Sequence, residues 1–157
     1  MKYFETQFDE YIKANEKIKL HKESEIPINF EELQNVIIFG PMGVGKYTYA
    51  LSYIKNFSPS KLKYEKKICY SYNKNNYYFK ISDIHYEVDM ELLGCNAKLL
   101  WHEIYLQIID IISAKIDKKG IILYKNFNKI HGELLEVFYS YMQNMFNKGV
   151  NIKHIIL

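Results

Sequence analysis

The feature that most constrains this 157-residue chain is an apolar strand that leads directly into a glycine-rich loop. Residues 36–39 (VIIF) are apolar and mostly β-branched, which is typical of a buried parallel strand. The loop is residues 40–46 (GPMGVGK), and the apolar spacing of residues 48–54 predicts a helix immediately after it. A strand, a glycine loop and a helix in this order predict a chain of the α/β class.

The rest of the chain alternates predicted strands and helices in the same way. We expect helices at 4–20, 99–116 and 134–146, and strands at 67–71, 77–81, 85–88, 121–124 and 152–157. This alternation predicts a parallel sheet flanked by helices, with an N-terminal helix and connector at 1–29 and a main domain at 30–157. The apolar residues at 155–157 predict a final strand with an open edge, which favours association.

The composition excludes several other classes of protein. Apolar residues make up 48% of the chain and charged residues 25%, which is ordinary for a globular domain. No apolar stretch approaches the roughly 18 residues that span a membrane, and the N-terminus lacks the apolar segment of a secretory signal. Cys69 and Cys95 alone cannot form a disulfide framework or a zinc site, and we expect both to be small buried residues. We therefore expect an intracellular, non-secreted protein with no membrane partner.

Each residue type in the loop suits the binding of phosphate. Glycine lets backbone N–H groups approach an anion closely, the helix after the loop offers its N-terminus, and Lys46 adds a positive charge. The GxxxxGK spacing between strand and helix predicts a P-loop (Walker A motif) that binds ATP or ADP, and the alternative is a glycine turn without a ligand. The residues expected to contact the nucleotide are Gly40, Pro41, Met42, Gly43, Val44, Gly45, Lys46, Tyr47 and Thr48.

The loop departs from the P-loop pattern at the residue after the lysine. A serine or threonine hydroxyl normally binds Mg²⁺ there, but this chain has Tyr47, whose phenol is too large for that position. Thr48 comes one place later and points about 100° further round the helix. Mg²⁺ is therefore a possible cofactor for which we can name no ligand.

The acids that support hydrolysis are also missing from their expected place. A hydrolysing P-loop protein carries an acid at the end of a second buried strand, but residues 121–124 lead into Lys125 and Asn126. Asn126 could orient a water molecule but cannot accept its proton. The alternative is that a carboxylate from elsewhere reaches the site, and the candidates are Asp83, Glu87 and Asp89. We assign no catalytic residue and no metal ligand, leave open whether the chain is an enzyme, and expect weak or absent hydrolysis.

The type of positively charged residue disfavours one class of P-loop enzyme. The sequence has 21 Lys+Arg residues, and all of them are lysine. P-loop kinases close arginines over the transferred phosphate, so a P-loop kinase is a disfavoured alternative for this chain. The net charge of +3 permits a nucleic-acid partner without arguing for one.

Three segments resemble one family. The loop motif, Gly40-Pro41-x-Gly43-x-Gly45-Lys46-x-Thr48, resembles that of clamp-loader AAA+ small subunits of the replication factor C type. Residues 82–89, with His85-x-Glu87, look like the second-strand region of those subunits, and residues 121–130 are similar to their acid-bearing strand. The resemblance covers residues 30–157. It does not extend to the later parts of those subunits, which are the sensor, the fifth strand, the arginine finger, the helical lid and the collar.

The resemblance implies a three-layer P-loop NTPase fold, AAA+-like and C-terminally truncated, with an incomplete nucleotide-binding domain at 30–157. It implies an ATP-binding protein of DNA replication, of the kind found in large DNA viruses, working in the replication compartment of the host cell. Its partners would be other clamp-loader-like subunits, with DNA contacted directly or indirectly. The alternative function is a non-enzymatic interaction protein that retains a degenerate P-loop fold.

Overall fold

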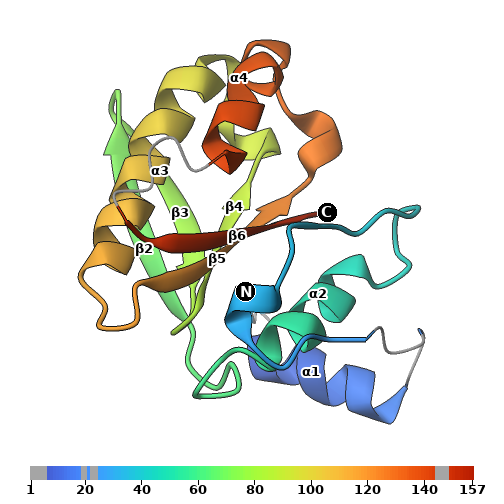
Figure 1. Cartoon of the computed structure of the whole chain (residues 1–157). Helices are drawn as coiled ribbons and strands as arrows, with labels where there is room; N and C mark the ends of the chain where they lie inside the picture. Colours follow the sequence, from blue (N-terminus) through green and yellow to red (C-terminus); the bar gives the residue numbers. More distant parts are fainter. Residues whose placement is uncertain (1–6, 19–20, 22–24, 144–148) are drawn as a thin grey trace.

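The computed structural model describes residues 7–18, 21, 25–143 and 149–157, and their strands form one six-stranded sheet (Figure 1). The spatial order is β1-β6-β5-β4-β3-β2. The strands β1, β6, β5 and β4 are parallel, and β3 and β2 add an antiparallel hairpin at one side. The strand bounds are β1 Val36–Ile37, β2 Lys66–Tyr72, β3 Asn75–Ile81, β4 His85–Asp89, β5 Lys119–Lys125 and β6 Asn151–Ile156. The predicted α/β class with a mostly parallel sheet is confirmed.

Helices cover both faces of this sheet (Figure 1). The helices α1 (Phe8–Lys17) and α2 (Lys46–Lys55) lie on one face, and α3 (Ala97–Ser113) and α4 (Gly132–Met142) lie on the other. Short 3₁₀ turns complete the chain at η1 (Phe30–Glu32), η2 (Glu91–Asn96) and η3 (Phe127–Lys129).

Successive residues of β5 face opposite cores, as the pleat of a strand requires. Ile121 and Leu123 pack with the buried residues of α1 and α2, whereas Ile122 and Tyr124 pack with those of α3 and α4. Trp101 is fully buried at the centre of the second core. The strands β4, β5 and β6 are therefore largely buried on both faces, and helices, sheet and helices form three layers.

The prediction of an open final strand is wrong. β6 lies between β1 and β5, with Ile155 opposite Val36 on one side and Leu123 on the other. The strands at the edges of the sheet are β1 and β2. Burial on both sides of β6, rather than an exposed edge, explains the apolar run at its end.

The strand predicted at 36–39 is parallel, but it is neither as long nor as buried as expected. Only Val36–Ile37 pair as a strand, the Ile37 residue is 71% exposed, and the Phe39 residue is 97% exposed. An edge strand has neighbours on one side only, so its apolar side chains are covered incompletely.

Several smaller expectations also change. Cys69 and Cys95 are exposed, contrary to the prediction, because β2 is an edge strand and Cys95 lies in a surface turn. The predicted helix at 4–20 is described only within Phe8–Lys17, and its residues 4–6 and 19–20, like 144–146 of the later helix, lie outside the described residues. No described helix is long and apolar enough to cross a membrane.

Candidate functional site

The parallel strands bring the predicted loop and the predicted acid positions to the same edge of the sheet. The loop comes after β1, while Asp89 ends β4 and Asn126 comes after β5. Backbone hydrogen bonds between neighbouring strands extend to this edge. Ile38 N–H donates to the Ile156 carbonyl at 2.8 Å, and Leu157 N–H donates to the Tyr124 carbonyl at 2.9 Å. The carboxyl ends of the strands in open α/β sheets are where ligands bind.

The glycine loop has a backbone conformation that only glycine adopts easily. Gly43 has φ of 80° and Gly45, the N-cap of α2, has φ of 84°. Within the described part of the chain, the N–H groups of Gly43, Gly45 and Lys46 donate to no acceptor. Unpaired amides in a turn at a helix N-terminus form a concavity suited to an anion.

Lys46 is folded back onto the loop that precedes it. Its Nζ donates to the Gly40 carbonyl at 2.6 Å and to the Pro41 carbonyl at 2.7 Å. On the other side, His21 Nε2 lies 2.6 Å from the Val44 carbonyl and ties the N-terminal connector to the loop. An anion in the loop would compete with two neutral carbonyls for the ammonium, and a charged oxygen is the stronger acceptor.

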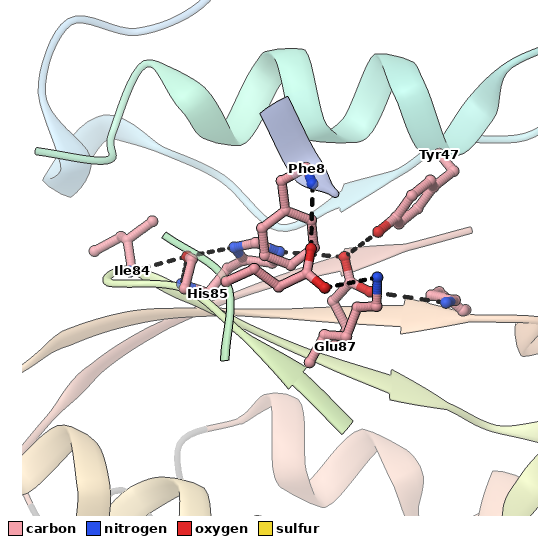
Figure 2. Close-up of polar contacts among 9 residues, drawn as sticks. Phe8, Tyr47, Ile84, His85 and Glu87 are labelled. Atoms are coloured by element: carbon pink, nitrogen blue, oxygen red, sulfur yellow. Dashed lines mark hydrogen bonds and ion pairs between the residues drawn. The ribbon is translucent and has the colours of Figure 1, made fainter. Parts of the chain in front are cut away.

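Tyr47 turns away from the loop and into the protein. Its hydroxyl donates to Glu87 Oε1 at 2.7 Å (Figure 2). Its ring packs edge-on against Tyr11, with centroids 4.9 Å apart. Burial, together with the negative charge of Glu87, raises the pKa of Tyr47 far above its ordinary value. The hydroxyl therefore stays protonated as a donor to Glu87. For Thr48, also predicted in the site, no side-chain hydrogen bond exists among the described residues.

Glu87 is the centre of a buried polar cluster on β4. Its residue is only 3% exposed, and its Oε1 also lies 3.3 Å from His85 Nε2 (Figure 2). The ammonium of Lys125 lies 3.7 Å from Oε2, which has no hydrogen-bond partner among the described residues. Burial acts to raise the pKa of Glu87, but hydrogen bonds from His85 and Tyr47 and the charge of Lys125 outweigh it and lower the pKa. Glu87 is therefore a buried anion at neutral pH.

Lys125 puts a positive charge where the sequence pattern leads one to expect an acid. Its Nζ lies 5.1 Å from the centre of the Tyr47 ring, beside the first turn of α2. Asn126, the next residue, donates from Nδ2 to both carboxylate oxygens of Asp89 at 3.0 and 2.9 Å. The amide of Asn126 is thus already engaged by a carboxylate.

The three carboxylates that could replace the missing acid lie at different positions relative to the loop. Asp83 lies at the opposite, amino end of β4, where Ser58 Oγ at 2.7 Å and Ser60 N–H at 2.8 Å donate to it. Asp89 is at the correct edge and accepts from Asn126. Glu87 is near the start of α2, but Tyr47 and Lys125 lie against it.

The contact of Tyr47 and Lys125 with one carboxylate is not among the features predicted from the sequence. The signal in the sequence was that two expected residues are replaced. Tyr47 stands where a serine or threonine is expected, and Lys125 stands where an acid is expected. Two departures from one motif at neighbouring ends of the sheet are a reason to look for a contact between them.

The donors near the loop do not fit a magnesium ion. Mg²⁺ prefers free carboxylate and hydroxyl oxygens, whereas Glu87 and Asp89 are engaged by other side chains and Lys125 adds a like charge. Across the described ranges, no group of three or more His, Cys, Asp or Glu residues could hold a metal ion. Comparison of the sequence with protein-family models and with curated proteins gives no match.

Proposed function

We propose that the chain binds ATP or ADP through residues 40–48 and hydrolyses it weakly or not at all. The observation that carries this proposal is the loop itself. It lies at the carboxyl edge of the sheet between β1 and α2, with Gly43 and Gly45 at positive φ and with unpaired amides beside Lys46. These are the features that a polyphosphate needs from a protein.

The ends of β4 and β5 support the second half of the proposal. Lys125 and Asn126 stand where hydrolysing P-loop proteins carry acids, and neither can remove a proton from water as a carboxylate does. Glu87, the nearest buried carboxylate, already accepts from Tyr47. We therefore expect phosphate release from ATP to stay near the background rate with Mg²⁺ present, and a turnover that Lys46→Ala abolishes would contradict this.

The wider role that we propose is that of a clamp-loader-like AAA+ subunit in DNA replication. It rests on the resemblance of the loop and of residues 82–89 and 121–130 to replication factor C small subunits. The exposed apolar side chains on and after the β1 edge, Ile37, Phe39 and Met42, favour a partner protein at that edge. Other clamp-loader-like subunits are the partners that this role requires, and DNA contact can be direct or through them.

A second candidate is a non-enzymatic interaction protein that has kept the fold without the ligand. The observation in its favour is that Lys46 already satisfies its ammonium on the carbonyls of Gly40 and Pro41. In this alternative the loop is closed permanently by its own lysine.

Thermal unfolding with added ATP or ADP separates the two candidates. A ligand that binds only the folded state at about 100 times its Kd adds roughly 2.7 kcal/mol to the free energy of unfolding. We expect a rise in Tm for the wild type, none for Lys46→Ala, and an unchanged rise for Lys66→Ala, a lysine exposed on the outer strand β2. No rise for the wild type with either nucleotide, with or without Mg²⁺, would reject nucleotide binding and favour the interaction protein.

A further inference from the structure

We propose that Lys125 takes the place of the divalent cation, so that this loop binds the polyphosphate without Mg²⁺. The inference rests on the proposed function, because it concerns how the same loop neutralises its nucleotide. We draw it because the side chains at the carboxyl edge of the sheet are not the oxygen ligands that Mg²⁺ requires.

The ammonium of Lys125 lies at the edge of the sheet that carries the glycine loop. The residue ends β5 at the ligand-binding edge, and its ammonium lies 5.1 Å from the centre of the Tyr47 ring. Tyr47 comes directly after Lys46 in the first turn of α2, where a metal-binding hydroxyl is expected. The ammonium of Lys125 therefore lies beside the side chain that stands in place of a metal-binding hydroxyl.

The Lys125 ammonium also has donors to spare. A lysine carries three N–H donors, and Lys125 is 35% exposed at its side chain. Its contact with Glu87 Oε2, at 3.7 Å, is an ion pair longer than a hydrogen bond. Among the described residues the Lys125 ammonium donates no hydrogen bond, so its N–H groups are available to an anion.

The surroundings hold Lys125 while rejecting a metal ion. Glu87 is buried and anionic, which keeps a cation at this point, and Tyr47 occupies its other oxygen. A divalent ion here would meet the like charge of Lys125, because that ammonium already faces Oε2, the Glu87 oxygen without a hydrogen bond. Lys46 and Lys125 would then both neutralise charge on the phosphates.

The charge of the ligand makes the inference testable. ATP without a metal carries more negative charge than the magnesium complex, so a cradle of two lysines favours the free form. A site that depends on Mg²⁺ shows the reverse preference. Adding Mg²⁺ should therefore weaken ATP binding in the first case and strengthen it in the second, and the wild-type protein alone distinguishes them.

The experiment measures the Kd of ATP by titration calorimetry, once with excess EDTA and once with saturating magnesium chloride. We expect the wild type to bind in EDTA at least as tightly as with Mg²⁺. Inorganic tripolyphosphate should show the same order, because the effect concerns the phosphates. Loss of wild-type binding in EDTA, with tight binding in Mg²⁺, overturns the inference and leaves nucleotide binding intact. No binding in either condition rejects the proposed function itself.

Variants test the residue. Lys125→Gln combined with Glu87→Gln removes both charges together and so leaves no buried carboxylate unpaired. We expect this pair to weaken the binding of free ATP about tenfold or more, the size of a lost hydrogen bond to a charged group. The control, Lys66→Gln, removes an equal charge from the outer strand and should leave the Kd unchanged. Wild-type affinity for free ATP in the double variant overturns the role of Lys125.

Lys125→Asp gives a second test that works in the opposite direction. It puts an acid back at the end of β5, beside Glu87. We expect free ATP to bind more weakly than in the wild type and Mg²⁺ to restore part of the affinity. If Mg²⁺ instead has the same effect on Lys125→Asp as on the wild type, Lys125 does not stand in for the metal.

Discussion

The two halves of the carboxyl edge differ in what they are made of. The loop after β1 acts through its backbone, with Gly43 and Gly45 at positive φ and amides left unpaired. The ends of β4 and β5 present side chains, with Lys125 at the position where the P-loop pattern predicts an acid. Backbone amides persist whatever side chains surround them, whereas an acid is lost by one substitution. Under the proposed function, the half that would hold a phosphate is therefore less sensitive to substitution than the half that would cleave it.

The largest effect that we expect comes from the side-chain half. Glu87→Ala leaves Lys125, His85 and Tyr47 facing a cavity without their shared acceptor. Removing this buried carboxylate leaves the Tyr47 hydroxyl without its charged acceptor and opens a cavity, which costs about 2 kcal/mol or more of unfolding free energy. Urea denaturation measures this loss. Asp89→Ala, two residues along the same strand, is the control, and an equal loss in both variants would show that Glu87 has no special place.

Tyr47→Phe tests one contact within that half. It removes only the hydroxyl that donates to Glu87 Oε1 at 2.7 Å and keeps the ring against Tyr11. A buried carboxylate that loses a donor costs about 1–2 kcal/mol. The same denaturation experiment gives the value. Tyr11→Phe keeps the neighbouring ring and is the control, and a Tyr47→Phe protein as stable as the wild type would contradict the contact.

A smaller change is expected in the backbone half. Gly43→Ala puts a Cβ on a residue with φ of 80°, where no atom lies within 4 Å, so only backbone strain opposes it. Such strain costs about 1 kcal/mol. Gly132, at the start of α4, is equally open and has a φ outside the left-handed region, so Gly132→Ala should leave stability unchanged or increase it. Thermal unfolding gives the Tm of both variants. A higher Tm for Gly43→Ala than for Gly132→Ala would contradict backbone strain at position 43.

The smallest difference concerns pH. The folded protein lowers the pKa of Glu87 below its ordinary value of 4.5, so the unfolded chain binds this proton more readily. The resulting stability is present above the unfolded pKa and is lost as the pH falls through the folded one. Unfolding free energies at pH values from neutral to below 4.5 should therefore decline less steeply for Glu87→Gln than for the wild type. Equal slopes would mean that Glu87 is not held as an anion.

The sequence predicted the fold where the signal is local. The apolar run at 121–124 and the helical spacing at 99–116 correspond to β5 and α3, and the glycine loop lies between β1 and α2 as expected. Each of these signals is contained in a few consecutive residues. The order of the strands is not, because β6 pairs with β1 across most of the chain. The predicted open edge at 155–157 failed for that reason.

The site shows the same division. Lys46 and the glycines of the loop could be found from their spacing alone, and the absence of an acid after the strand at 121–124 could be found at Lys125 and Asn126. The direction of the Tyr47 side chain could not, since a residue in the first turn of a helix can face either the loop or the sheet. Its partner Glu87 lies on a strand that the sequence places forty residues away. Only the packing of α2 against β4 brings the two together.

The position of β6 between β1 and β5 has a consequence for biosynthesis. β1 leaves the ribosome before α2, β5 and α4, whereas its partner in the sheet, Asn151–Ile156, leaves only after all of them. Until then a nascent chain exposes one flank of β5 and has no support for the strand that carries the glycine loop. Pairings this remote in sequence form late and slowly. Protection of this unfinished edge by a chaperone would then matter more than for a protein whose neighbouring strands emerge in succession.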